Sequence, residues 1–517
     1  MTTFYFGEDL LTPTVALQIA NGEIGCAIGE RAKVNINLSH KNTLLIAESE
    51  KTVYGINTGF GPLCDSKISK EQIKLLQENI LKSHSVGVGP EVPEIISRLM
   101  MITKVHALSM GYSGISLAVL ERILYFINNQ ITPIVPSQGS VGASGDLAPL
   151  AHLFLPLIGF GEVKVAGEKL AVIAMQQLHQ LTPISLGPKE GLALINGTQF
   201  ILAYAVLGVS RLFNCLEAAD IIGAMSLEGL LGSVSPFKEE LHKLRPFEGS
   251  QHVAYRMTVL LRGSEMVESH KNCGRVQDPY SLRCIPQVHG ASRNAWAHLN
   301  QLVTTELNSV TDNPIILSAE ESISGGNFHG QLLALPLDYA GLAASEIGNI
   351  SDRRTYLLLE GKNGGLPRLL MKNTGINSGF MIPQYTSAAL ASENKGLCWP
   401  ASADSIPTSL GQEDHVSMGS ISGRKLNMIL DNLENILAIE LICAAQAFDY
   451  HKPLKSGPIL DQCHSLIRSQ IDHAEEDRIF GHDIKIGHGL ITSGQLVKTA
   501  NLAANDHGIS LNRSLTE

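Results

Sequence analysis

The stretch Gly423-Arg-Lys-Leu-Asn-Met-Ile-Leu-Asp-Asn-Leu-Glu-Asn-Ile-Leu-Ala-Ile-Glu-Leu-Ile-Cys-Ala-Ala-Gln-Ala-Phe-Asp-Tyr450 decides the fold class. Its apolar side chains recur at three- and four-residue steps, at Leu426, Ile429, Leu430, Leu433, Ile436, Leu437 and Leu441. This spacing predicts one long helix with a continuous apolar stripe. Similar patterns cover residues 292–311, which end at Asp312-Asn-Pro314, and residues 332–361.

Strand patterns are few and short, as around Gly161–Gly167. We therefore predict an all-α protein with a bundle of long central helices. The chain has no internal repeat or low-complexity tract that would mark a linker. We expect a smaller N-terminal domain over residues 1–210, and a long-helix bundle with C-terminal helices over residues 211–517.

The composition narrows the class of protein. A chain of 517 residues with 44% hydrophobic and 17% charged residues can bury a large core. Its formal net charge of -10 argues against nucleic-acid binding, which uses basic patches, and favours a small-molecule substrate.

The cellular setting follows from the cysteines and the apolar stretches. The eight cysteines are scattered and form no Cys-x-x-Cys pair: Cys26, Cys64, Cys215, Cys273, Cys284, Cys398, Cys443 and Cys463. Such thiols are typical of a reduced, cytoplasmic protein. The N-terminus lacks the pattern of a signal peptide, and the most apolar stretches, 147–161 and 195–212, are short or interrupted. We expect a soluble protein with no membrane span.

The stretch Gly139-Ser-Val-Gly-Ala-Ser-Gly-Asp-Leu-Ala-Pro-Leu-Ala-His152 contains the tripeptide Ala143-Ser144-Gly145. The Gly145 amide nitrogen has no side chain beside it, so it can approach the Ala143 carbonyl carbon, close a five-membered ring and lose water. Loss of a second water from Ser144 leaves a methylidene-imidazolone, which is an electrophile that no ordinary side chain provides. Taken alone the tripeptide is more commonly a loop. Its glycine spacing fits neither a nucleophile elbow, a P-loop nor a dinucleotide fingerprint.

Other segments support the catalytic interpretation because together they resemble the aromatic amino acid ammonia-lyases, and among them the histidine ammonia-lyases. Besides residues 139–152, the matching segments are Tyr54-Gly-Ile-Asn-Thr-Gly-Phe-Gly61, Ser83-His84 before Gly87-Val-Gly89, Gly191-Leu-Ala-Leu-Ile-Asn-Gly-Thr198, Gln277-Asp-Pro-Tyr-Ser-Leu-Arg-Cys284, Ser324-Gly-Gly-Asn-Phe-His329 and Gln412-Glu-Asp-His-Val-Ser-Met418. They occur in family order from about residue 50 to about residue 450.

The resemblance implies elimination of ammonia from L-histidine to give trans-urocanate, through a 4-methylidene-imidazol-5-one formed from Ala143-Ser144-Gly145. It implies no metal and no external cofactor. It also implies a homotetramer whose active sites each draw on three chains.

Candidate roles follow from the chemistry and the matched positions. A base must take the β-proton, and Tyr54 ranks before Tyr280, which lies beside Arg283 in the sequence. Arg283 suits the substrate carboxylate, which a guanidinium binds through two hydrogen bonds. Asn196 offers a donor and an acceptor for the cofactor oxygen or the substrate.

Three further positions match the family. Gln277 and Phe328 match residues that line the site. Asp146 is expected to cap a helix that starts at Leu147, where its carboxylate would accept from free backbone N–H groups. The resemblance implies that it also helps to fold the cyclising loop.

Substrate choice depends on Glu413 and His84. A glutamate facing an imidazole can orient its N–H, which a phenyl ring lacks; lyases of phenylalanine or tyrosine differ at the segment around Glu413. His84 also suits a tyrosine hydroxyl. Two departures from the histidine enzymes are Gln331 and Trp399, and the tryptophan precedes the segment of Glu413, where a large ring would narrow the pocket.

Two alternatives remain open at this point. One is a tyrosine or phenylalanine lyase or an aminomutase that uses the same electrophile. The other is a helical scaffold protein whose tripeptide never cyclises, although a scaffold has no need for so many polar groups on separate segments.

Overall fold

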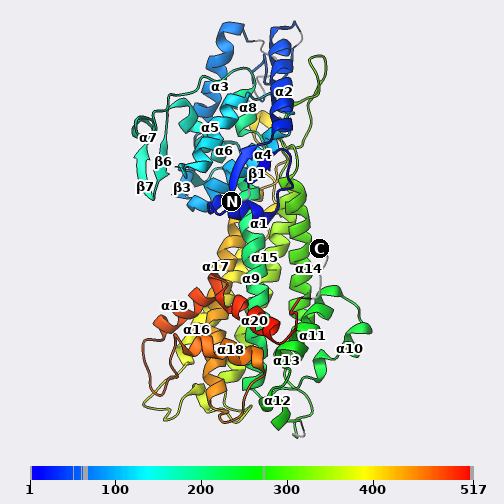
Figure 1. Ribbon diagram of the computed structural model, residues 1–517, viewed down its shortest axis with the longest axis vertical. Helices are drawn as coiled ribbons and strands as arrows, with labels where there is room; N and C mark the ends of the chain where they lie inside the picture. Colours follow the sequence, from blue (N-terminus) through cyan, green and yellow to red (C-terminus); the bar gives the residue numbers. More distant parts are fainter. Residues whose placement is uncertain (1–2, 51, 60, 62–67, 272–273, 513–517) are drawn as a thin grey trace. The chain divides into compact units, whose positions relative to one another are not determined.

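The computed structural model describes residues 3–50, 52–59, 61, 68–271 and 274–512. In this part of the chain, twenty α-helices accompany nine strands, none longer than four residues (Figure 1). The predicted all-α class is confirmed.

The chain divides into two compact units. Unit 1 comprises Met1–Gly208, Leu299–Asp338 and Pro400–Arg424, and unit 2 comprises Val209–His298, Tyr339–Trp399 and Lys425–Glu517. The first break lies close to the boundary expected near residue 210, but two later segments join unit 1. Unit 1 therefore contains Phe328 and Glu413, whereas Tyr280 and Arg283 belong to unit 2.

Unit 1 is a helical layer structure with small sheets. Its own helices are α1 (Pro13–Ala20), α2 (Glu30–Glu48), α3 (Lys70–His84), α4 (Glu94–Ser109), α5 (Leu117–Asn128), α6 (Leu147–Phe154), α7 (Val172–Leu178) and α8 (Glu190–Ile195). Its strands are β1 (Thr3–Phe6), β2 (Gly25–Ile28), β3 (Val88–Glu91), β4 (Thr132–Pro133), β5 (Pro136–Gln138), β6 (Glu162–Val165), β7 (Glu168–Ala171), β8 (Ile315–Ile316) and β9 (Ser322–Ile323). The pair β1–β2 is parallel, and the sheets β3–β5, β4–β6–β7 and β8–β9 are antiparallel.

Three helices of unit 1 meet where the polar motifs of the sequence converge. Helices α3, α6 and α8 all contact one another. Helix α3 ends at His84, α6 begins directly after Asp146, and α8 ends just before Asn196. Packing of their apolar faces therefore brings three distant segments of the chain to one place.

Unit 2 consists of helices α10 (Glu239–Lys243), α11 (Glu248–Leu260), α12 (Glu265–Ser269), α13 (Tyr280–Arg283), α16 (Met381–Leu397), α18 (Pro458–Arg468), α19 (Phe480–Thr492) and α20 (Gln495–Asp506). Four long helices have residues in both units: α9 (Gln199–Gly229), α14 (Ile285–Leu307), α15 (Gln331–Leu359) and α17 (Gly419–Asp449).

Within unit 2, buried ion pairs join the long helices. Asp220 of α9 accepts from His289 of α14 at 2.7 Å and from Arg256 of α11 at 2.8 Å. Glu440 of α17 accepts from Arg354 Nη2 of α15 at 2.9 Å. Because each charge is paired and hydrogen-bonded, the network tolerates complete burial.

The long helices match the sequence pattern closely. Helix α17 covers the stretch that was predicted from its apolar stripe, and α15 covers almost the same residues as the expected 332–361. Helix α14 begins earlier than the predicted Ser292, because Pro286 sits at the second position of the helix, where the missing N–H has no consequence.

Helix α9 corrects one expectation about apolar stretches. The stretch that starts at Ile195 is interrupted at residues 196–198, between α8 and α9, but α9 then continues to Gly229 and is long and apolar enough to cross a membrane. In its most apolar window, however, 72% of the residues are buried inside the structure. Such burial is typical of a core helix of a folded protein.

Candidate active site

The loop that carries Ala143-Ser144-Gly145 runs directly into helix α6 and depends on its glycines. Gly142 and Gly145 adopt φ values of 70° and 76°, which favour glycine. A Cβ at Gly145 would lie 2.1 Å from the Gly197 carbonyl oxygen. Gly145 therefore has to be a glycine for the loop to approach the segment after α8.

Asp146 holds this loop in a way that corrects the sequence interpretation. Helix α6 does start at Leu147, but the Asp146 carboxylate makes no capping bond to it. Oδ2 instead accepts from the backbone N–H groups of Phe200, at 3.1 Å, and Ile201, at 2.9 Å, in the first turn of α9. Oδ1 accepts from Ser140 Oγ at 2.9 Å. The completely buried carboxylate therefore joins the loop to the start of a different helix.

Asn196 contacts the loop from the other side. Its Nδ2 donates to the Ser144 carbonyl oxygen at 3.1 Å, and the next residue, Gly197, accepts from the Asp146 N–H at 2.7 Å. Asn196 Oδ1 is buried and has no hydrogen-bond partner among the described residues. The amide is therefore fixed by one end and offers an acceptor at the other.

Ser144 and Glu413 meet although they are far apart in the sequence. Ser144 Oγ donates to Glu413 Oε1 at 2.8 Å. The other carboxylate oxygen, Oε2, accepts from the hydroxyl groups of Thr408, at 3.1 Å, and Ser409, at 2.6 Å. Three hydroxyl donors hold this partly buried carboxylate in one orientation.

Two cavities of unit 1 open onto this pair. The first has a volume of about 470 Å³, and its lining includes Tyr54, His84, Ser144 and Glu413. The second has a volume of about 520 Å³ and shares Tyr54, Ser144 and Glu413 with the first, while Asn196 and Phe328 belong to its lining. Six residues predicted from separate motifs thus line two cavities of the same unit that share part of their lining.

Tyr54 lies in a turn, as its glycine-rich surroundings predict. Its phenolic oxygen accepts a hydrogen bond from the Gly61 N–H at 3.2 Å. Phe60 of the same motif lies outside the described residues.

His84 occupies the end of α3, beside the first cavity. Its Nδ1 is 2.9 Å from Ser83 Oγ. Burial lowers the pKa of His84, while a hydrogen bond to the Ile80 carbonyl and the charge of Glu413 act in the opposite direction. Its imidazole therefore favours the neutral form, which can accept as well as donate a hydrogen bond.

The remaining predicted residues belong to unit 2. Tyr280 and Arg283 form the ends of the short helix α13, and the guanidinium carbon of Arg283 lies 4.3 Å from the centre of the Tyr280 ring. Arg283 Nε is buried without a hydrogen-bond partner among the described residues. Gln277 is exposed, as is Trp399, whereas Gln331 opens helix α15 in unit 1.

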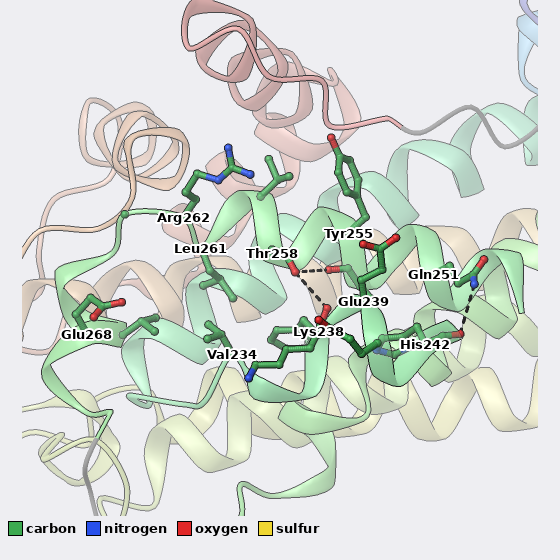
Figure 2. Close-up of a pocket in the computed structure, with 16 residues that line it drawn as sticks. Val234, Lys238, Glu239, His242, Gln251, Tyr255, Thr258, Leu261, Arg262 and Glu268 are labelled. Atoms are coloured by element: carbon green, nitrogen blue, oxygen red, sulfur yellow. Dashed lines mark hydrogen bonds between the residues drawn. The ribbon is translucent and has the colours of Figure 1, made fainter. Parts of the chain in front are cut away.

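Unit 2 also contains a cavity of about 560 Å³ between the short 3₁₀ helix η3 (Ser235–Phe237) and helices α10, α11 and α12 (Figure 2). Thr258 Oγ1 donates to the carbonyl oxygens of Phe237 and Ala254, and Gln251 Nε2 donates to that of His242 (Figure 2). None of the predicted site residues lines it. The unit 1 cavities therefore hold the candidate chemistry.

Several neighbours of the site escaped the sequence reasoning. Thr408 and Ser409 bond Glu413, and Lys104 donates to the Asn196 carbonyl oxygen. Serine and threonine are too common in loops to stand out. Lys104, by contrast, could have been noticed, because it is the only lysine in the largely apolar segment Leu99–Leu108.

Possible metal ligands and cysteine thiols are two other kinds of reactive group to locate in the described part of the chain. No cluster of three or more His, Cys, Asp or Glu side chains there is arranged to hold a metal ion. The six described cysteines form no disulfide with one another: Cys26, Cys215, Cys284, Cys398, Cys443 and Cys463. Cys64 and Cys273 lie outside the described residues.

Comparison with known proteins agrees with the geometry of this site. The chain is 46% identical over 493 residues to a histidine ammonia-lyase of Natranaerobius thermophilus, which covers 95% of this chain and 97% of the relative. A histidine ammonia-lyase of Sorangium cellulosum is 48% identical over 457 residues, 87% of this chain and 89% of the relative.

Solved structures give the same result. The histidine ammonia-lyase of Trypanosoma cruzi is 38% identical with a TM-score of 0.90, covering 100% of this chain and 99% of that one. The tyrosine aminomutase of Streptomyces globisporus is 32% identical with a TM-score of 0.91, covering 96% and 98%. The sequence profile of the aromatic amino acid lyases matches residues 11–469. This chain belongs to the aromatic amino acid lyase family.

Proposed function

We propose that this enzyme eliminates ammonia from L-histidine to give trans-urocanate. The observation that carries the proposal is the position of Glu413, whose Oε1 lies 2.8 Å from Ser144 Oγ in a cavity also lined by Tyr54 and His84. The two bacterial relatives described above are histidine ammonia-lyases, which supports the same substrate.

We propose that Ala143-Ser144-Gly145 becomes a methylidene-imidazolone, and the residues around it fit such a group. Gly145 has the positive φ and the lack of Cβ that a close approach of its nitrogen to Ala143 requires. The Ser144 carbonyl oxygen, which the ring would retain, accepts from Asn196 Nδ2. When formed, the group supplies an electrophilic carbon to which the substrate amine can add, so that the amine becomes a better leaving group.

The roles of the neighbouring side chains follow from their atoms. Asn196 Nδ2 stabilises negative charge that develops on the Ser144 oxygen, and its free Oδ1 can accept from the substrate amine. Tyr54 takes the β-proton as a phenolate, and the Gly61 N–H, which donates to the same oxygen, stabilises the negative charge that this oxygen carries before the transfer. Asp146 keeps the loop in register with α9, and Phe328 contributes an apolar wall.

Glu413 selects the substrate ring. Its carboxylate can orient an imidazole N–H and stabilise positive charge on the ring, because Thr408 and Ser409 hold it in place. His84 faces the same cavity and binds the ring from α3.

A second candidate is a tyrosine lyase or aminomutase that uses the same electrophile. His84 suits a phenolic hydroxyl, and the tyrosine aminomutase of Streptomyces globisporus shares the fold over nearly the whole chain. A phenylalanine lyase is the third member of this group of alternatives. Glu413 argues against them all, since a phenol or phenyl ring offers its carboxylate no N–H.

We propose that Tyr280, Arg283 and Gln277 complete the site from neighbouring subunits of a homotetramer. Arg283 would bind the substrate carboxylate, which its unpartnered Nε supports. Unit 2 also exposes large apolar side chains that favour assembly, among them Tyr339, Leu342, Tyr356, Ile382 and Tyr385. We place the enzyme in the cytoplasm, without a membrane or nucleic-acid partner and without an external cofactor.

Purified protein is incubated in turn with L-histidine, L-tyrosine and L-phenylalanine, and the unsaturated acid is followed by absorbance. We expect turnover of histidine and little or none of the other two. Ser144→Ala has no hydroxyl to lose, so it should remain folded and lose nearly all activity. Ser137→Ala on β5, outside the cavity linings, serves as its control. Retention of most of the turnover by Ser144→Ala would overturn the electrophile.

Glu413→Gln keeps the shape of the side chain and removes its charge. It should depress turnover of histidine far more than any residual turnover of tyrosine. Asp414→Asn, which removes the neighbouring exposed charge, is the matched control and should behave as the wild type. If the wild type preferred tyrosine, the second candidate function, a tyrosine lyase or aminomutase, would replace the first.

A further inference from the structure

Lys104 is a charged residue in an apolar part of unit 1. It lies on α4, where residues 99–109 are all buried, and its own exposure is 1%. A buried ammonium group needs acceptors to offset the loss of water. Lys104 Nζ donates to the Asn196 carbonyl oxygen and, at 3.4 Å, to Gln199 Oε1.

These acceptors belong to residues 196–199, the segment that is hydrogen-bonded to the loop of Ser144. Asn196 Nδ2 donates to the Ser144 carbonyl oxygen, and Gly197 accepts from the Asp146 N–H. Gln199 is itself held by a 2.8 Å bond from Nε2 to Thr311 Oγ1. Lys104 thus bonds to the same segment that bonds to the loop.

A buried charge is usually paired with an opposite charge, and the same unit provides an example. Lys189, also completely buried, forms an ion pair of 2.5 Å with Asp312. Within the described residues Lys104 forms no ion pair, and its partners are a carbonyl and an amide oxygen. Burial lowers the pKa of Lys104 to about 7, while the charges of Asp312 and Asp146 act against this shift. The loss of hydration makes such a buried ammonium group unfavourable for the stability of the fold.

We propose that Lys104 is a positioning residue for ring closure: it fixes the Asn196 peptide and thereby the grip of Asn196 on the Ser144 carbonyl group. This inference rests on the proposed function. In the closure, the Gly145 nitrogen bonds to the Ala143 carbonyl carbon. The carbonyl oxygen leaves as water with the N–H hydrogens of Gly145 and Ser144. The Ser144 hydroxyl then leaves as water with the hydrogen of its α-carbon, and no oxidant is needed.

The test follows ring closure directly rather than through activity. Full-length wild type and Lys104→Met are made by cell-free synthesis, and the intact mass is sampled over time for the loss of two waters. Far-UV circular dichroism checks that both are folded. We expect Lys104→Met to close the ring at least about tenfold more slowly, the change that follows from loss of one hydrogen bond to a charged group. Lys104→Arg keeps a charged donor and should restore most of the rate.

Lys189→Met is the matched control, because it also removes a buried ammonium group but leaves Asn196 untouched, and it should close at the wild-type rate. If Lys104→Met does not fold, Lys104→Gln, with a neutral donor, should still close more slowly than Lys104→Arg. Equal rates for wild type and Lys104→Met, or for the Gln and Arg variants, would overturn the role of Lys104 alone. A wild-type chain that keeps both waters would overturn the proposed function together with it.

Discussion

Asp146→Ala should destabilise the protein by an amount that the structure allows us to work out. The carboxylate is the acceptor for the N–H groups of Phe200 and Ile201, which lie in the first turn of α9 and have no partner within that helix. Each buried donor left unsatisfied costs about 1–3 kcal/mol, so the loss should be about 2–6 kcal/mol. A water that enters the vacated space would bring the loss toward the lower value.

Asp146→Asn is the matched control because its side-chain oxygen can still accept from both N–H groups, and its NH2 group can donate to Ser140 Oγ. It should lose no more than about 1 kcal/mol, the net worth of a typical hydrogen bond. The free energy of unfolding is measured from urea titrations at pH 8 and constant protomer concentration. Burial raises the pKa of the Asp146 carboxyl group to about 7, so a pH of 8 lies above this pKa and favours the carboxylate. An alanine variant as stable as the wild type, or an asparagine variant as unstable as the alanine one, would refute the reasoning.

Gly145→Ala should prevent normal folding of the loop, because its Cβ would lie 2.1 Å from the Gly197 carbonyl oxygen at a φ of 76°. Intact mass should show a chain that keeps both waters, while circular dichroism reports whether the chain is folded. A ring formed at the normal rate would contradict this reasoning. Tyr54→Phe should reduce kcat by several orders of magnitude with little change in unfolding free energy, since it removes only the proton acceptor; a kcat within about tenfold of the wild type would exclude Tyr54 as the base. Burial lowers the pKa of His106 from 6.5 to about 4, so its contribution to stability is intact above pH 6.5 and is lost as the pH falls toward 4, by up to about 3 kcal/mol. In urea titrations from pH 7 to pH 4, His106→Gln should lose less stability than the wild type, and parallel curves would exclude this histidine as a source.

The long helices were predictable because the signal for each is local. The apolar steps from Leu426 to Leu441 fit one face of a helix in any context, and α17 indeed spans them. Helix α14 ends at Leu307, before the expected Thr311, although Thr311 itself is buried. The length of α9 was missed because the apolar stretch was taken to end at residue 212, whereas the helix continues to Gly229.

The site was predictable as a set of residues and not as an arrangement. The resemblance brought Tyr54, Ser144 and Glu413 together, but no local pattern links segments so far apart. Asp146 shows the limit most clearly. Its place before α6 suggests a cap for that helix, while its actual donors belong to α9 and reach it only after tertiary packing.

The bond between Ser144 and Glu413 has a consequence for the order of events during protein synthesis. The two residues are 269 positions apart, whereas Asp146 and Phe200 are separated by 54. At ~5–20 residues per second, a ribosome needs about 13 to 54 s to reach Glu413 after it has added Ser144. The segments of α8 and α9 that bond the loop are therefore synthesised well before its carboxylate partner, which is added only when most of the protein has been made.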